Sequence, residues 1–332
     1  MKRSADPMTR NRLDHAMLQQ AADWYARLQA PGTDADTLAA WRDWHAQGEM
    51  QRQAWHYVER VGQRFATLRQ EGDDARQTLE SARRAERSRR QVLRSLSVLC
   101  SGALLGWATW RAVPLPGLLV AWRADYRSAT GEIREIALAD GSRVWLNGAS
   151  ALDVDYRNDV RQLYLLDGEV LIETARDDRP FVVETAQGWL LALGTRFSVR
   201  MHDERTLLNV FEGAVQVHPR DGGQQQVLPA GRQVTFDHAH IGTSRPASSQ
   251  RQSWRKGILL ADDITLGELV GELQRHHRGY LGVAPDIAGL RVMGTYPLND
   301  SEQALAMLER VLPIRVRRPL PWWTTLEARE VD

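Results

Sequence analysis

Residues 134–147 read REIALADGSRVWLN, two runs of alternating residues on either side of an Asp-Gly pair. Alternation with a period of two is typical of β-strands, because successive side chains of a strand point to opposite faces. Asp140-Gly141 favours a two-residue type I′ turn, which needs positive φ at both central positions. The stretch therefore predicts a β-hairpin.

Short runs of the same kind continue along the chain to residue 236, and turn residues such as Gly168, Gly194 and Gly213 separate them. Many short strands with little helical periodicity predict an all-β domain over residues 124–240, built as a sandwich, a roll or a β-helix. The further predicted strands are Arg161–Leu166, Glu169–Glu173, Phe181–Thr185, Leu190–Leu193, Phe197–His202, Leu207–Phe211, Ala214–His218, Gln226–Leu228 and Gln233–Phe236.

Residues with catalytic or metal-binding chemistry are scattered. Glu132, Glu169 and Glu212 each adjoin a glycine, and glycosidases use two carboxyl groups at a defined separation. Acidic residues also flank turns throughout all-β proteins, and nothing in the sequence fixes a separation between these three. We therefore expect no enzyme, no catalytic residue, no cofactor and no metal site. The histidines lack metal-ligand spacing and are expected at the surface: His202, His218, His238, His240 and the pair His276-His277.

Residues 254–326 change to a mixed pattern, with strand-like runs at 257–260, 281–283, 290–293 and 314–316. Thr265 and Glu268 match a capping box, and a second helix begins after Asp300. The order predicts two β-α-β half-units that form one small α+β sheet covered on one side. Such a unit can pair a strand edge or bury a helix face with a partner. Trp322 and Trp323 are expected in a packed terminal strand. The first helix has an apolar face made of Leu266, Leu269, Val270 and Leu273.

Residues 1–70 are predicted to form a small all-α bundle of three helices. The first has a 3.6-residue stripe at Met17, Ala21, Trp24 and Leu28, and the second follows capping residues at 33–36. The bundle contains Trp24, Trp41, Trp44 and Trp55, more tryptophan than so small a core needs. Because tryptophan is enriched at binding hot spots, we expect at least one to contact a partner. The alternative is that all four pack inward.

An uncharged run from Ser95 to Trp110 follows an arginine-rich cluster over residues 83–94. A basic flank before an apolar run orients a membrane helix with its basic side in the cytoplasm. Residues 92–113 would rise roughly 33 Å as a helix, against about 30 Å of hydrocarbon. We expect a transmembrane helix over 92–113, preceded by a charged juxtamembrane linker over 71–91. The alternative is a buried helix of a soluble protein.

The arginines expected to set the membrane orientation are Arg89, Arg90 and Arg94. The run Ser88–Arg94 also resembles a twin-arginine export motif, with a plain stop flank as the alternative. The net charge of +1, and the lack of another basic stripe, argue against direct nucleic-acid binding. The one cysteine, Cys100, excludes an intramolecular disulfide.

Taken in order, these segments resemble a FecR-type transmembrane anti-sigma regulator over nearly the whole chain. The helical part resembles that family in Ala21, Trp24 and Leu28, in Trp41 and Trp44, and in Ala54-Trp55. Each β motif is weak alone, and the ordered set is specific. The β motifs are Thr130-Gly131-Glu132-x-Arg134, Leu138-x-Asp140-Gly141-Ser142, Leu146-Asn147, Gly168-Glu169, Arg179-Pro180-Phe181-x-Val183-x-Thr185, Leu193-Gly194-Thr195-x-Phe197-x-Val199, Glu212-Gly213-x-Val215 and Ala230-Gly231.

The resemblance implies a single-pass protein of the bacterial inner membrane, with its N-terminus in the cytoplasm and its C-terminus in the periplasm. The helical domain would bind an extracytoplasmic-function sigma factor, and we expect the binding residues to be Trp24, Leu28, Trp41, Trp44 and Trp55. The α+β domain resembles the short domain shared by secretins and TonB-dependent receptors. It would sense the signalling domain of a TonB-dependent outer-membrane receptor, loaded with a ferric siderophore or a similar ligand, through the apolar helix face at 266–273.

In this family the signal commonly passes by regulated proteolysis, which implies intramembrane and periplasmic proteases as further partners. A homodimer is left open. A second hypothesis is a membrane-anchored envelope-assembly or glycan-binding protein, which would have no cytoplasmic partner. A third is a carbohydrate-active enzyme built on a β-helix, which would need two acidic side chains that converge in a groove.

Overall fold

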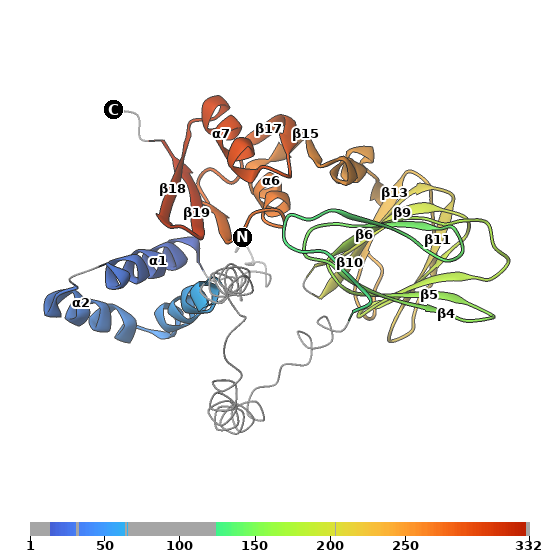
Figure 1. Cartoon of the computed structure of the whole chain (residues 1–332), viewed down its shortest axis with the longest axis horizontal. Helices are drawn as coiled ribbons and strands as arrows, with labels where there is room; N and C mark the ends of the chain where they lie inside the picture. Colours follow the sequence, from blue (N-terminus) through green and yellow to red (C-terminus); the bar gives the residue numbers. More distant parts are fainter. Residues whose placement is uncertain (1–13, 31–32, 64, 66–123, 203, 330–332) are drawn as a thin grey trace, which may run out of the picture.

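The computed structural model describes residues 14–30, 33–63, 65, 124–202 and 204–329, which form three units (Figure 1). A helical unit comprises residues 14–65, a β unit comprises residues 124–246, and an α+β unit comprises residues 258–328. The 3₁₀ helix η2, Ser249–Lys256, connects the β unit to the α+β unit. Figure 1 shows the α+β unit between the other two.

The helical unit begins with α1, His15–Gln29, and α2, Ala35–Ala46, and a third helix covers residues 49–63. The Asp34 carboxylate accepts a hydrogen bond of 2.8 Å from the backbone N–H of Thr37, as the predicted capping stretch requires. The buried face of α1 contains Leu18, Ala21 and Ala22, whereas Met17 is only partly buried. The stripe is therefore rotated by about one residue from the predicted one.

The predicted fold class included a transmembrane helix, and this prediction is wrong for the part of the chain that the structure describes. None of the helices in the described ranges combines the length and the apolar character that a bilayer crossing needs. α1 has 15 residues and rises about 22 Å, well short of the roughly 30 Å of hydrocarbon. The segment 92–113, on which the prediction was placed, lies outside the described residues.

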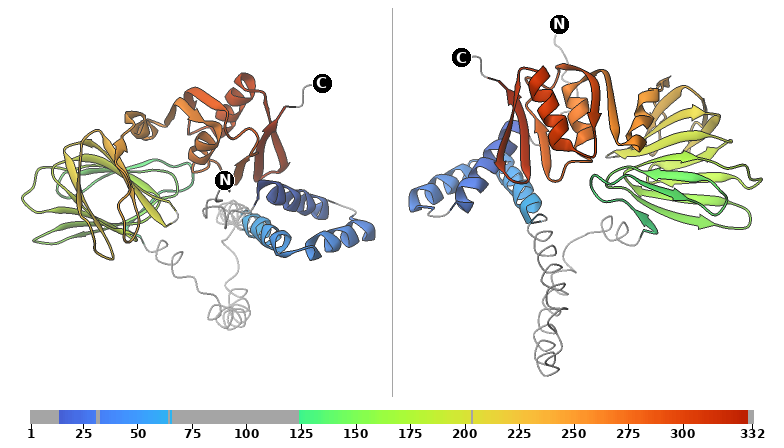
Figure 2. Two further views of the ribbon diagram at one scale, coloured as in Figure 1. Left: turned by 180° about the vertical axis from the view of Figure 1, so that it is seen from behind. Right: turned by 45° about the horizontal axis from the view of Figure 1, so that its top comes forward.

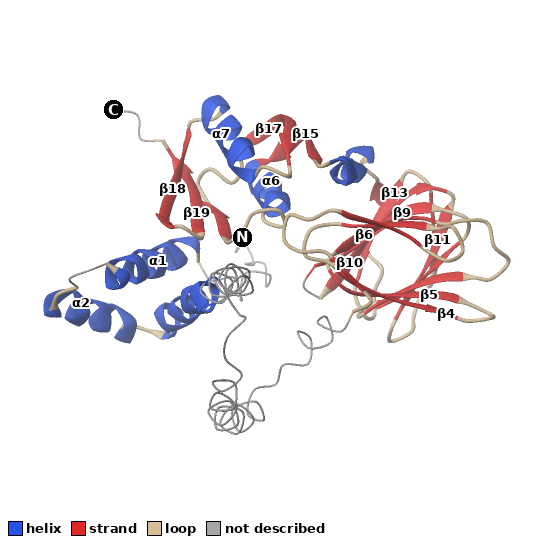
Figure 3. Cartoon of the chain, in the orientation of Figure 1, coloured by secondary structure: helices blue, strands red, loops and turns tan. Residues whose placement is uncertain are grey.

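The β unit is a sandwich of two seven-stranded sheets (Figure 3). Its strands are β1 Tyr126–Arg127, β2 Arg134–Ala137, β3 Arg143–Leu146, β4 Ala151–Tyr156, β5 Arg161–Asp167, β6 Glu169–Glu173, β7 Phe181–Thr185, β8 Gly188–Ala192, β9 Arg196–His202, β10 Arg205–Glu212, β11 Ala214–Pro219, β12 Gln226–Pro229, β13 Arg232–Phe236 and β14 Arg245–Pro246. The strand orders are β1-β4-β5-β7-β8-β11-β12 and β14-β13-β10-β9-β6-β3-β2. Apolar residues from both sheets, such as Leu163 and Val199, form one core.

The predicted hairpin forms, but its turn is of another kind. β2 pairs antiparallel with β3, from Arg134 opposite Leu146 to Ala137 opposite Arg143. Only Gly141 of the central pair has positive φ, at 84°, so the turn cannot be type I′. The N–H of Gly141 donates to the Leu138 carbonyl (3.0 Å), and a left-handed glycine after such a turn makes a longer bulged connection. The Asp140 side chain points into the protein and is buried.

The α+β unit has seven elements, and its strands form two small sheets instead of the single sheet expected. β15 pairs antiparallel with β17, and β19 lies between β16 and β18, parallel to β16. The two half-units therefore exchange strands, which local sequence pattern does not reveal. Trp323 is fully buried in β19, as predicted for the terminal strand. The elements are β15 Ile258–Thr265, α6 Leu266–Leu273, β16 Tyr280–Val283, β17 Arg291–Pro297, α7 Ser301–Val311, β18 Ile314–Leu320 and β19 Trp323–Ala328.

The β unit and the α+β unit share a continuous core. Trp145 and Leu171 belong to strands of the β unit, and both are buried in the same cluster as the α6 and α7 side chains. Two guanidinium groups lie over the Trp145 ring, that of Arg143 at 5.2 Å and that of Arg255 at 5.3 Å from its centroid. Cation–π contacts of this kind stabilise the junction between the two units in addition to its apolar packing.

The helical unit contacts the other side of the α+β unit, as both views of Figure 2 show. Trp322 and Trp323 lie in one apolar cluster with Trp55, and the Tyr25 ring meets Trp322 edge to face at 5.5 Å. An ion pair of 3.0 Å joins Arg317 of β18 to Asp23 of α1.

Candidate partner-binding site

The four tryptophans of the helical unit gather in one cluster. Trp24 lies 6.5 Å from Trp44 between ring centroids, and Trp41 lies 5.0 Å from Trp55. The Nε1 of Trp44 donates to Oε1 of Gln20 at 3.0 Å. Trp44 and Trp55 are buried, whereas Trp24 and Trp41 are half-buried. Two of the predicted sigma-binding tryptophans are thus core residues, and two keep part of their rings accessible.

Two exposed apolar residues of the helical unit were not predicted from the sequence. Leu38 of α2 is 37% exposed and Met50 of the third helix is 50% exposed. Leu38 lies three residues before Trp41, so the two side chains are neighbours on one face of α2. Leu28, another predicted contact residue, is half-buried. The surface that α2 offers to a partner is therefore formed by Leu38 and the accessible part of Trp41.

The predicted receptor-binding face of α6 is in the core of the α+β unit. All four of its apolar residues (Leu266, Leu269, Val270 and Leu273) are buried in this conformation. The predicted capping box is present, because Thr265 N–H donates to the Glu268 carboxylate at 2.9 Å and Glu268 N–H donates to the Thr265 hydroxyl at 3.2 Å. The large apolar side chains that this unit does expose are Met293 and Val311, neither of which was predicted.

Charged residues line the junction between α6 and the β unit. The Glu272 carboxylate of α6 accepts from Arg200 of β9 and lies 3.5 Å from Arg251. Burial favours a higher pKa for Glu272, but the two guanidinium groups outweigh burial and hold the pKa below its usual value. The carboxylate is therefore ionised at neutral pH and ties the two units together.

The expectation that the histidines lie at the surface is wrong for three of them. His276 and His277 are buried at the end of α6, and Nδ1 of His277 lies 3.0 Å from the Ser301 hydroxyl. Burial, with Arg275 nearby, lowers the pKa of His276 to about 4. His218 is also buried, with its ring stacked on Trp189 at 3.4 Å between centroids. These imidazoles are neutral packing groups at physiological pH.

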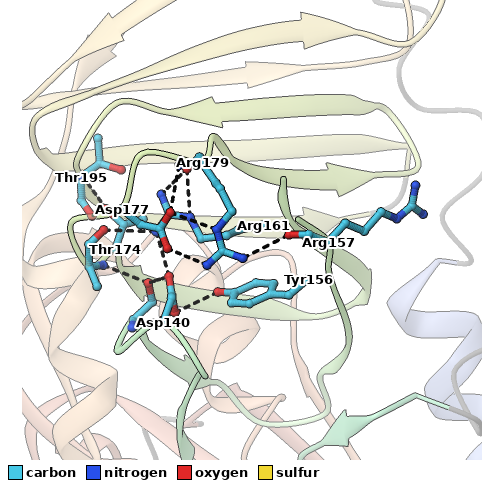
Figure 4. Close-up of polar contacts among 10 residues, drawn as sticks. Asp140, Tyr156, Arg157, Arg161, Thr174, Asp177, Arg179 and Thr195 are labelled. Atoms are coloured by element: carbon cyan, nitrogen blue, oxygen red, sulfur yellow. Dashed lines mark hydrogen bonds and ion pairs between the residues drawn. The ribbon is translucent and has the colours of Figure 1, made fainter. Parts of the chain in front are cut away.

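Residues of the β motifs converge on one buried polar cluster (Figure 4). Asp140, from the hairpin turn, forms an ion pair of 2.8 Å with Arg161 of β5, and their side chains are 0% and 5% exposed. The same carboxylate accepts from the Ser142 hydroxyl at 2.6 Å and from the Tyr156 hydroxyl at 3.1 Å. Burial raises the pKa of Asp140, and these hydrogen bonds more than offset it, so the pKa lies below its ordinary value.

Arg161 also ties down the segment before β7. Its guanidinium donates to the Arg179 carbonyl at 2.7 Å and to the Ala175 carbonyl at 3.2 Å. Nearby, the hydroxyl of Thr174 accepts from the backbone N–H of Thr195 at 2.8 Å. Arg161 thus connects the motif at 138–142 to the motif that begins at Arg179, and Thr174 holds the start of the strand at Thr195.

The three acidic residues considered for catalysis make separate structural contacts. Glu132 accepts from the backbone N–H of Ala129 at 2.8 Å, and buried Glu169 accepts from the Asn147 amide at 3.0 Å. Glu212 forms an ion pair of 2.6 Å with Arg196. Among the described residues no group of three or more metal-ligating side chains is found. Arg89, Arg90 and Arg94, predicted to orient the chain in a membrane, lie outside the described residues.

Comparisons with known proteins agree with this organisation. Residues 124–216 match the family described as FecR protein, and residues 19–61 match a domain of unknown function, DUF4880. Two crystal structures of a candidate anti-sigma factor from Parabacteroides distasonis ATCC 8503 share the fold at 21% identity. The 2.50 Å structure has a TM-score of 0.51 and the match covers 61% of this chain and 97% of that chain. The 1.65 Å structure has a TM-score of 0.52, with 61% and 98% covered. A comparison with curated proteins found no match.

Charged and aromatic residues of the three units are engaged in contacts between units. The family matches, in their order along the chain, confirm the resemblance to FecR-type anti-sigma regulators that was predicted from the sequence.

Proposed function

We propose that the helical unit binds an extracytoplasmic-function sigma factor, and that the β and α+β units receive the signal from a TonB-dependent outer-membrane receptor loaded with a ferric siderophore or a similar ligand. The observation that supports sigma binding most is the tryptophan cluster, which falls within the residues that match DUF4880. Half-buried aromatic rings beside an exposed aliphatic side chain are typical of binding hot spots. The protein would act by binding, without a catalytic step of its own, and regulated proteolysis would end the interaction.

The contact surface that we assign to the sigma factor is the α2 face of Leu38 and Trp41. Both side chains keep accessible apolar surface, and burying it against a helix of the partner is favourable by about 25 cal/mol per Å². The buried Trp44 and Trp55 would support this face from below, because they fix the angle between α1, α2 and the third helix.

Expression of residues 1–82 tests sigma binding directly, with sigma-dependent transcription and pull-down of the sigma factor as readouts. Leu38→Glu should abolish binding, because it places a charge at the apolar contact. Ala40→Glu is the matched control, since Ala40 is exposed on the opposite side of α2 and receives the same charge. If the fragment binds no sigma factor and changes no transcription, or if both variants bind equally, the assignment fails.

The contact between the helical unit and the α+β unit affects whether the two partners can be bound in different compartments. A cytoplasmic sigma factor and a periplasmic receptor can be bound by these units only if the contact between Asp23 and Arg317 opens. Cysteines at these two positions, in a Cys100→Ser background, report the contact through a bismaleimide crosslinker. We expect crosslinking in the purified chain and none in intact cells. Efficient crosslinking in cells would place both units in one compartment and refute the separation of partners.

A further inference from the structure

The β unit contains a half-open cavity of about 510 Å³ between strands β10 and β13 and the loop that follows β13. The lining includes outward-facing residues of the strands, such as Leu207, Gln233 and Thr235, and the start of β14. The loop is fixed over the strands because Arg232 donates to the Ser244 carbonyl at 2.7 Å. A cavity of this size is within the range of small-ligand sites.

Three arginines line this cavity, from three different elements: Arg205 of β10, Arg245 of β14 and Arg251 of η2. Within the described residues, no carboxylate forms an ion pair with Arg205 or Arg245. Arg251 lies 3.5 Å from the Glu272 carboxylate, which also forms an ion pair with Arg200. Most other arginines of the β unit form ion pairs, whereas Arg205 and Arg245 meet at one cavity without an ion-pair partner among the described residues.

The single acidic residue in the lining does not neutralise these cations. The carboxylate of Asp237 accepts hydrogen bonds from the backbone N–H groups of Ala239 (2.9 Å) and His240 (2.8 Å), which hold its pKa below the usual value. Asp237 therefore shapes the loop, and the positive charges of Arg205 and Arg245 stay without an ion-pair partner among the described residues. Gln233, Thr235 and Thr243 add side-chain donors that make no hydrogen bond within the described residues.

A neighbouring cavity limits where an anion can lie. This second cavity, of about 380 Å³, shares Gln233 and Arg251 with the first. Its remaining charged lining is largely acidic, with Glu169, Glu268 and Glu272. An anion is attracted to the arginine-lined cavity and repelled from the acidic one. The interaction energy of two unit charges about 4 Å apart near a protein surface is on the order of a few kcal/mol.

From this arrangement we propose that the cavity bounded by Arg205, Arg245 and Arg251 is a binding site for a phosphate monoester or diester. The planar guanidinium fork matches the oxygens of a phosphate group and can donate two parallel hydrogen bonds to it. The apolar floor at Leu207 accommodates the carbon skeleton that carries the phosphate. The ligand is thus either a soluble phosphorylated metabolite or the headgroup of an anionic lipid.

Thermal unfolding of the full chain tests the proposal, because a ligand that binds only the folded state raises the midpoint, by an amount that grows with the logarithm of its concentration over Kd. The soluble probe is glucose 6-phosphate, compared with glucose and sodium chloride at equal ionic strength. The lipid probe is a vesicle of phosphatidylglycerol, compared with one of phosphatidylcholine, in a sedimentation assay. Stabilisation by the sugar phosphate identifies a soluble ligand, and sedimentation with phosphatidylglycerol alone identifies a headgroup. If the sugar phosphate does not raise the midpoint and the chain does not sediment with phosphatidylglycerol vesicles, the proposal is overturned.

Substitutions locate the binding. Arg205→Gln and Arg245→Gln should each weaken binding about tenfold, the effect of losing one charge-assisted hydrogen bond at an accessible site. Arg176→Gln is the matched control, because Arg176 is exposed on the same unit, forms no ion pair within the described residues and lies outside the cavity. All three should unfold at the wild-type midpoint without ligand. Equal weakening by Arg176→Gln would show a general charge effect and refute the site.

Discussion

The ion pair between Asp140 and Arg161 should be the most costly single contact to break in the β unit. Arg161→Met keeps most of the side-chain volume and removes the guanidinium. It leaves the Asp140 carboxylate buried with two hydroxyl donors and the backbone N–H of Ser142, and the carbonyls of Ala175 and Arg179 lose the donors that Arg161 supplied. Removing one partner of a buried pair costs about 3–5 kcal/mol. We expect a loss of about 4 kcal/mol in the free energy of unfolding of this unit.

The matched control is Arg157→Met, which removes an arginine from the same region (Figure 4). The pair of Arg157 with Asp155 is exposed, with side chains 60% and 39% accessible, and exposed pairs contribute about 0–1 kcal/mol. The double variant Asp140→Asn/Arg161→Met should be less destabilised than the sum of its single variants, by about 2 kcal/mol, because it buries no unpaired charge.

Hydrogen exchange of the slowest amides in β3 and β5 measures these free energies in the intact chain, since amides that exchange through unfolding of the whole unit report its free energy of unfolding. The Asp140 contribution should also depend on pH. Its folded-state pKa lies below the unfolded value of 3.8, so the stabilisation is present above pH 3.8 and is lost as the pH falls through the folded-state pKa. If Arg161→Met costs no more than Arg157→Met, or if the coupling is below about 0.5 kcal/mol, the ion pair does not hold the motifs together.

Three further outcomes are expected. Glu272→Gln should loosen the junction between the β and α+β units, because it removes the carboxylate that accepts from Arg200, and faster hydrogen exchange in α6 with unchanged exchange in β5 would show this. Replacing His276 by Phe should remove a pH dependence: the wild-type imidazole has a pKa of about 4 folded and about 6.5 unfolded, so stability falls as the pH drops from 6.5 to 4, by up to about 3 kcal/mol, and an acid titration of the unfolding midpoint compares the two proteins. Thr265→Ala should cost about 1 kcal/mol by removing the cap of α6, whereas Thr265→Ser should be close to neutral, as chemical denaturation would measure.

The strands were largely predictable because apolar and polar residues alternate along a half-buried strand and because glycine is frequent in the turns between strands. Glu169–Glu173 and Phe181–Thr185 were predicted with the bounds that the structure has. β4, Ala151–Tyr156, was missed although Leu152 and Val154 face the core. Asp153 and Asp155 alternate with them, and aspartate is generally depleted in strands. The outer face of this strand is accessible, so these carboxylates are tolerated there.

The arrangement of the α+β unit was beyond sequence pattern for a different reason. Its helices, its capping box and most of its strands follow from residues within a few positions of one another, and these were predicted. Pairing of β15 with β17, and of β16 with β19, joins segments tens of residues apart. Local periodicity is the same whichever strands pair, so the number of sheets cannot be decided without tertiary contacts.

The same limit applies to the candidate sites. The 3.6-residue stripe of the first helix predicts that Trp24 lies on its inner side, but not how much of the ring the other helices cover. The apolar face of α6 satisfies the pattern of a partner-binding helix and that of a core helix equally well. The arginine-lined cavity brings together side chains from β10, β14 and η2, and no motif in the sequence connects them.

The residues that identify the family and the residues available to partners are different sets, and this affects how variants should be interpreted. Asp140, Ser142 and Thr195 belong to the ordered motifs, and the structure uses them to hold turns and strand ends in buried contacts. Leu38 and Arg205 belong to no motif and are accessible. Loss of signalling in a motif variant would therefore report unfolding of the β unit unless its stability is measured alongside. Variants of accessible residues, which leave stability unchanged, are the ones that can reveal where a partner binds.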